Sequence, residues 1–138
     1  MEIVSWESAQ KIVAEAMRKA TADYRRPICV SVVDKYGFLV AFGRMDSTPL
    51  RSIEISRRKA YTAVRMLMPT DQFLKMLMER NFQAGYFGDD TLTALPGGNP
   101  LKDAAGNILG AVGVSGLAAS EDQVITEAMA ELMKAGKV

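Results

Sequence analysis

The chain has 138 residues, a formal net charge of +1 and an apolar fraction of 49%, which predict one globular domain over residues 1–138 with a buried core. This charge offers no clustered positive field for nucleic acid, and no apolar run approaches the ~18 residues that a membrane-spanning helix needs. The single Cys29 excludes an intrachain disulfide. We therefore expect a cytoplasmic protein whose partners are neither nucleic acid nor membrane.

The first third of the chain predicts a helix followed by a hairpin. Apolar residues repeat at helical spacing after Ser5, which predicts a helix with Ser5 as its N-cap, ended by Pro27. Residues 28–33 are short, apolar and β-branched, and a polar turn separates them from a second strand over residues 38–45. Arg44 ends a row of apolar side chains on that second strand.

The middle of the chain predicts two helices and then two strands. A helical pattern follows Pro49 and stops at Pro69, and a shorter helix begins with Thr70 as its N-cap. Strands are predicted at residues 92–95 and 107–114.

A last helix closes the chain. Ser120 and Gln123 are predicted to form its capping box, with Glu121 and Asp122 at its positive end. Strands joined by short turns, with helices before and after them, predict an α+β fold in which helices cover an antiparallel sheet.

The complete absence of histidine limits the chemistry of any site. Imidazole is the usual general base near neutral pH, the commonest metal ligand and a frequent axial haem ligand. Any reaction must therefore use carboxylates, lysine, arginine, hydroxyls, the thiol, the backbone or a bound cofactor. We predict no metal site.

Glycines and prolines are concentrated in residues 95–101 and 110–116. Glycines at this density let another group approach bare backbone. That group could be a ligand, a neighbouring subunit or a tightly packed helix, and all three interpretations stay open. Neither a dinucleotide fingerprint nor a P-loop is present.

Three ordered segments resemble one protein family. Residues 46–63, residues 96–101 (Pro-Gly-Gly-Asn-Pro-Leu) and residues 110–116 (Gly-Ala-Val-Gly-Val-Ser-Gly), with Asp122 beyond them, resemble the GlcG/HbpS family, which includes the C-terminal domain of PduO-type proteins. The resemblance implies a profilin-like three-layer sandwich with a five-stranded antiparallel sheet between helices. It also implies a homo-oligomer.

The resemblance makes haem a candidate cofactor. PduO-type members use an N-terminal histidine as an axial ligand, and the first helix here offers none. Haem would have to be held without histidine, by Tyr61, Tyr86, Lys59 or a methionine.

We expect the candidate site to combine a strand end, the helix after it, the glycine turn and the last strand. The candidate ligand-binding residues are Arg44, Asp46, Ser52, Gly97, Gly98, Asn99 and Ser115. Arginine can clamp a carboxylate in two hydrogen bonds. Glu54 and Lys59 are the candidate catalytic residues, as acid/base or amine. In the alternative interpretation, Glu54 and Arg58 form a solvated ion pair and Lys59 stays on the surface.

Two functions remain open at this point. The first is a binding domain for haem, a corrinoid-pathway compound or a small carboxylate metabolite. The second is a cofactor-independent lyase or isomerase that acts on a small organic acid.

Overall fold

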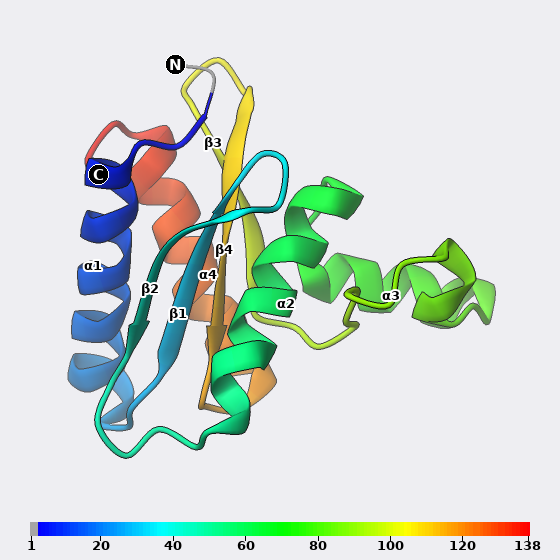
Figure 1. Ribbon diagram of the computed structural model, residues 1–138, viewed down its shortest axis with the longest axis horizontal. Helices are drawn as coiled ribbons and strands as arrows, with labels where there is room; N and C mark the ends of the chain where they lie inside the picture. The colour runs from blue at the N-terminus through cyan, green and yellow to red at the C-terminus, as the bar shows by residue number, and fades with distance from the viewer. Residues whose placement is uncertain (1–2) are drawn as a thin grey trace.

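A computed structural model describes residues 3–138, which form one four-stranded antiparallel sheet and four α-helices (Figure 1). The elements in chain order are α1 (Trp6–Tyr24), β1 (Cys29–Asp34), β2 (Leu39–Arg44), α2 (Arg51–Met66), α3 (Thr70–Arg80), the 3-10 helix η1 (Ala84–Phe87), β3 (Gly98–Lys102), β4 (Ile108–Ser115) and α4 (Ala119–Lys134). The strand order is β2-β1-β4-β3, so β2 and β3 are the two edges.

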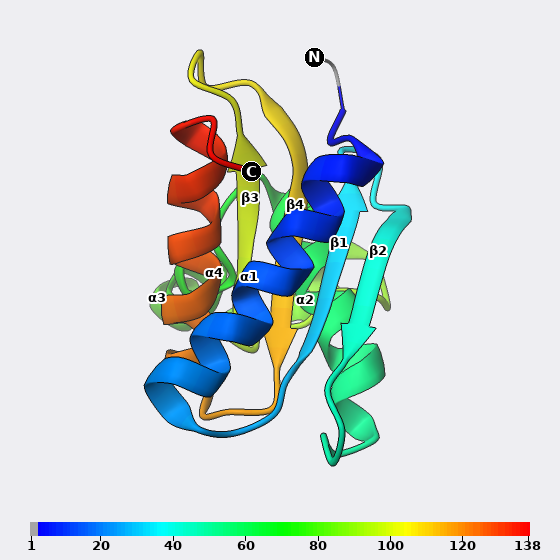
Figure 2. The ribbon, with the colours of Figure 1, turned by 90° about the vertical axis from the view of Figure 1, so that its left-hand side faces the viewer.

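The sheet is the middle of three layers. Helices α1 and α4 cover one face and α2 crosses the other (Figures 1 and 2). The central strands β1 and β4 are buried over almost their whole length because both of their faces are covered. The main core lies under α1 and α4, and includes Ile12, Val30, Val112 and Ile125.

Helix α3 and η1 project from the three layers as a separate arm (Figure 1). The arm has a small core of its own, made of Phe73, Leu77 and Leu92. No helix within residues 3–138 is long and apolar enough to cross a membrane.

The α+β class is confirmed, but the five-stranded sheet is wrong, because residues 3–138 contain four strands. Residues 92–95, predicted as a strand, pair with no other strand. The Thr93 N–H instead donates to Thr62 Oγ1 at 2.9 Å, and Leu92 packs in the core of the arm. Part of the glycine-proline segment is itself the edge strand β3.

The helix starts are partly confirmed. Ser5 is the N-cap of α1, and its hydroxyl accepts the Ser8 N–H at 3.0 Å. The predicted capping box at Ser120 is wrong, because α4 begins at Ala119 and Ala118 is its N-cap. The Glu121 carboxylate accepts the Ala118 N–H at 3.1 Å, so the acidic residue that caps this helix lies three positions after Ala118.

Helix α2 packs directly on bare backbone of β3 and β4. A Cβ atom at Gly113 would lie 2.1 Å from the Ser56 carbonyl oxygen, and one at Gly98 would lie 2.4 Å from the Lys59 carbonyl oxygen. Real Cβ contacts are not this short, so any side chain would push α2 away from the sheet. At these positions a packed helix therefore accounts for the glycines.

We expect Gly113→Ala to lower the free energy of unfolding by about 3 kcal/mol, because the added methyl group overpacks the α2–β4 contact. Gly85→Ala is the matched control, since a Cβ at Gly85 has no atom within 4 Å. It should change stability by less than about 0.5 kcal/mol. Urea unfolding followed by circular dichroism measures both, and equal effects of the two substitutions would contradict this packing argument.

Candidate functional site

Lys59 is a fully buried cation between α2, β4 and α4. Its exposed fraction is 2%, and its Nζ donates to the Val114 carbonyl oxygen and to Asp122 Oδ2, both at 2.9 Å. The other carboxylate oxygen, Asp122 Oδ1, accepts the Leu117 N–H at 3.1 Å. Gly97 leaves the room for this pair, because a Cβ there would lie 2.8 Å from Lys59 Nζ.

Burial dominates the electrostatics of this pair. Removal from water lowers the pKa of Lys59 and raises the pKa of Asp122, while the attraction between the two charges acts in the opposite direction on each. The net directions show that the desolvation effect is the larger one at both groups. Such a pair adds little to the free energy of unfolding, because the desolvation of the two charges offsets their attraction.

A chain of amide hydrogen bonds lies next to the ion pair. The Gly97 N–H donates to Gln123 Oε1 at 2.6 Å, and Gln123 Nε2 donates to Asn99 Oδ1 at 2.5 Å. Thr126 Oγ1 donates to the same Asn99 oxygen at 2.5 Å. Because a backbone N–H can only donate, Gly97 fixes the orientation of the Gln123 amide, which in turn fixes that of Asn99.

Asn99 connects this buried network to a hollow at the surface. The hollow has a volume of about 210 Å³ and lies between the edge strand β3 and α4. It is lined by Pro69, Asn99, Pro100, Lys102, Ala130, Glu131 and Lys134. Within residues 3–138, the hydrogen bonds of the Asn99 side chain all reach Oδ1. The two N–H donors on Nδ2 therefore have no partner among the described residues, and Asn99 lines the hollow together with the two lysines.

The structure brings only part of the predicted site to this hollow. Asn99 lines it, and Gly97 and Gly98 hold the network behind it. Arg44 and Asp46 are exposed at the opposite edge of the sheet, three strand spacings or roughly 14 Å from β3.

The other predicted residues also lie away from the hollow. Ser115 is buried opposite Cys29 on β1, and Ser52 is buried at the start of α2. Glu54 is exposed, accepts a 2.7 Å hydrogen bond from Arg57 Nε and lies 3.7 Å from Arg58 Nε, as the solvated ion-pair interpretation expected. The other part of that interpretation, a surface position for Lys59, is wrong, because Lys59 is buried. The catalytic roles of Glu54 and Lys59 stay predictions.

Sequence reasoning did not find four of the residues around this hollow. Lys102 and Lys134 are ordinary surface lysines in sequence. Gln123 and Thr126 carried a usable signal, because two polar residues three positions apart lie on the face of α4 that packs on the sheet.

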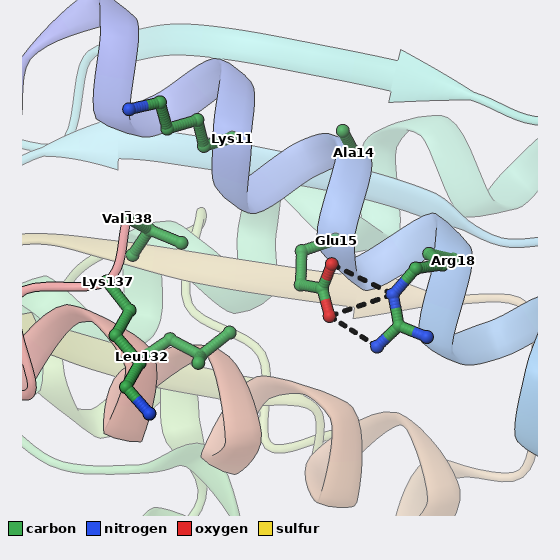
Figure 3. A pocket seen from close by; sticks show the side chains of 7 residues that line it. All are labelled: Lys11, Ala14, Glu15, Arg18, Leu132, Lys137 and Val138. Carbon is green, nitrogen blue, oxygen red and sulfur yellow. Dashed lines mark hydrogen bonds and ion pairs between the residues drawn. The ribbon is translucent and has the colours of Figure 1, made fainter.

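Two larger hollows have less specific linings. One of about 510 Å³ lies between α1 and α4 (Figure 3), but its Lys11 is paired with Glu7 and its Arg18 with Glu15 at the surface. Another, of about 290 Å³, lies between α1 and β2, and its lining is mostly apolar. Neither hollow is lined by a residue of the buried amide network, so we place the candidate site at β3 and α4.

Lys59→Met leaves the Asp122 carboxylate buried without its cation, and we expect it to cost about 3–5 kcal/mol of unfolding free energy. The double variant Lys59→Met/Asp122→Asn removes both charges and should be more stable than Lys59→Met.

The difference in stability between Lys59→Met and the double variant should depend on pH, and its sign follows from the pKa of Asp122. Burial holds the folded-state pKa of Asp122 above its ordinary value of 3.8. The contribution of Asp122 to the free energy of unfolding is therefore lost as pH rises through that folded-state pKa. Without Lys59 the pKa rises further. The deficit of Lys59→Met relative to the double variant should therefore be larger at pH 8 than at pH 5 in urea unfolding. Equal deficits at the two pH values would contradict the buried-charge argument.

Comparisons with known proteins agree on one family. A family model described as "Haem degrading protein HbpS-like" matches residues 4–131. The "Uncharacterized 15.0 kDa protein in dhaT-dhaS intergenic region" of Citrobacter freundii is 30% identical over 125 residues, covering 87% of this chain and 85% of that protein.

Solved structures share the fold. A double mutant of HbpS from Streptomyces reticuli superposes with a TM-score of 0.85 at 27% identity, covering 96% of this chain and 88% of the other. A PduOC:Heme complex superposes with a TM-score of 0.79 at 23% identity, covering 94% of each chain, which shows a common fold alone. From the match to the family model over nearly its whole length, the chain belongs to the HbpS-like family.

Proposed function

We propose that this protein is a small-ligand-binding domain that takes a small organic anion in the hollow between β3 and α4. The orientation of the Asn99 amide carries the proposal, because the buried network directs an acceptor inward and leaves two donors for the hollow. A donor whose direction is fixed before binding loses little freedom when a ligand arrives. Family membership supports a small ligand, since the matching family model is described as that of a haem-degrading protein.

The lining of the hollow indicates the kind of anion. Asn99 Nδ2 can donate to a carboxylate oxygen, and Lys102 and Lys134 supply positive charge beside it. The Glu131 carboxylate at the same rim disfavours a second negative charge and can accept a hydrogen bond from a hydroxyl group. About 210 Å³ lies below the ~300–1,000 Å³ of pockets for drug-sized ligands. A monocarboxylate of few atoms fits best.

Four candidate haem ligands among the described residues are poorly placed to hold haem. Tyr61 donates its hydroxyl to Asp89 at 2.6 Å, and Lys59 is sealed in its ion pair. Tyr86 lies exposed in the arm. Met17 lines the α1–β2 hollow, whose volume of about 290 Å³ is small for a porphyrin. We therefore assign no role to haem here, and a corrinoid is larger still.

Lactate and benzoate, titrated into ¹⁵N-labelled protein, test the proposal. We expect the Asn99 side-chain amide signals to shift, with the smaller lactate favoured. Lys102→Glu/Lys134→Glu should weaken binding at least ~10-fold, because it replaces both cations at the rim. Lys75→Glu, a substitution of an exposed lysine on α3, is the matched control and should leave binding unchanged. Shifts at Asn99 that survive the double variant at equal affinity would contradict the cation part of the proposal, and no shift at Asn99 with either acid would contradict the site.

Haemin addition gives an independent check. We expect broad absorbance typical of nonspecific association, with no defined stoichiometry, because the α1–β2 hollow beside Met17, at about 290 Å³, is small for the porphyrin. A sharp Soret band at one haem per chain would overturn that expectation. If Met17→Leu then removed the band, the ligand site would be the α1–β2 hollow.

A further inference from the structure

The hollow between β3 and α4 has a backbone acceptor as well as side-chain donors. Strand β3 pairs with β4 on one side only, so its other edge is free. The Gly97 carbonyl oxygen accepts the Val114 N–H at 2.8 Å, so the residues of β3 that bond to β4 alternate, counted from Gly97. The backbone groups of Gly98 and Pro100 therefore point away from β4.

Hydrogen bonds at Gly98 agree with this alternation. Its N–H donates to Thr70 Oγ1 at 2.9 Å, and its carbonyl oxygen accepts Gln123 Nε2 at 3.3 Å, so both of its outward groups have partners. Pro100 has no N–H, and its outward carbonyl oxygen has no donor within residues 3–138. Because Pro100 lines the hollow, the free edge of β3 supplies an unpaired acceptor there.

The donors of Asn99 are accessible as well. Within residues 3–138, every buried side-chain nitrogen or oxygen has a hydrogen-bond partner. Asn99 Nδ2 has none, so this nitrogen is reachable from outside, and the hollow is the surface depression that Asn99 lines. Two adjacent residues of one strand, Asn99 and Pro100, thus supply donors and an acceptor to the same hollow.

The charged residues of the rim have both signs. Lys102, Glu131 and Lys134 line the hollow and are exposed, and none of them forms an ion pair within residues 3–138. A ligand with a carboxylate alone would use the two lysines and leave Glu131 beside a like charge. A ligand with a positive group next to its carboxylate would have an opposite charge for each of its own.

We infer that the ligand of this hollow is a small α-amino acid, bound as its zwitterion. The inference rests on the proposed function, because the carboxylate keeps the Asn99 donors and the lysines, and the ammonium group is the second half of the ligand. Glu131 and the Pro100 carbonyl oxygen are the acceptors for that ammonium group. A volume of about 210 Å³ limits the side chain to a few atoms.

An ammonium group suits these acceptors better than a hydroxyl group does. A hydroxyl has a single hydrogen to donate, so it leaves either Glu131 or the Pro100 carbonyl oxygen without a donor, whereas an ammonium group has three. A hydrogen bond between charged groups is also roughly twice as strong as one between neutral groups. A hydroxy acid such as lactate is therefore the weaker ligand of the two.

Three acids with the same carbon skeleton test the inference. Propionate, L-lactate and L-alanine differ only in the group on the second carbon, which is a hydrogen, a hydroxyl or an ammonium group. Each is titrated at pH 7 into ¹⁵N-labelled protein and followed at the Asn99 side-chain amide. We expect alanine to bind at least ~3-fold more tightly than lactate, and lactate more tightly than propionate.

Glu131→Gln gives a sharper result, because its effects on the ligands have opposite signs. The substitution removes the negative charge that attracts an ammonium group and repels a carboxylate. Alanine should lose at least ~3-fold in affinity, while lactate and propionate should bind as tightly as before or more tightly. Glu127→Gln removes the same charge from an exposed position of α4 outside the lining, and it is the matched control that should leave all affinities unchanged.

The outcomes separate this inference from the proposed function. If lactate binds the wild type at least as tightly as alanine, the amino-acid ligand is overturned and the carboxylate site stands. An alanine preference that survives Glu131→Gln also overturns it, since the ammonium group would then lie elsewhere. No shift at Asn99 with any of these acids would contradict the site itself, and the inference with it.

Discussion

The close approach of α2 to the sheet is the constraint on which the rest of the structure depends. Backbone of α2 lies where side chains of β3 and β4 would otherwise stand, and Gly98 and Gly113 make this contact possible. The same approach buries Lys59 away from water. A buried ammonium group requires an anion, so Asp122 on α4 must lie on the far side of the same strands. The close contact between α2 and the sheet thus affects the position of α4 as well as that of α2.

The buried polar groups near this contact form a chain of hydrogen bonds. The last residue of that chain, Asn99, lies at the surface hollow. Within residues 3–138, every buried side-chain nitrogen or oxygen has a hydrogen-bond partner. The Gly97 backbone orients Gln123, and Gln123 with Thr126 orients Asn99. A rigid interior therefore sets the direction of a donor at the rim of a hollow. This is the preorganisation that small-ligand sites require, because a few atoms of ligand supply little binding free energy to order a loose site.

Local signals predicted local structure well. The α1 cap at Ser5 and the hairpin of β1 and β2 follow from short patterns, and the structure contains both. Strand β3 was missed because its glycines and Pro100 are typical of turns, and only pairing with β4 makes that segment a strand. The burial of Lys59 depends on a partner 63 positions later in the chain, which no local pattern contains. Asn99 was predicted as a ligand-binding residue, while the lysines beside it are recognisable only once the fold places them.

The arm of α3 and η1 should open locally more easily than the rest of the structure. Its core of Phe73, Leu77 and Leu92 is small, and elements with few buried contacts open at lower free energy than the main core. Thr70, the first residue of α3, accepts the Gly98 N–H through its hydroxyl at 2.9 Å, and Pro69 next to it lines the hollow. Local opening of the arm would therefore release the first residue of β3 and one wall of the hollow together. Access to the proposed ligand hollow is in this way tied to an element whose own core is small.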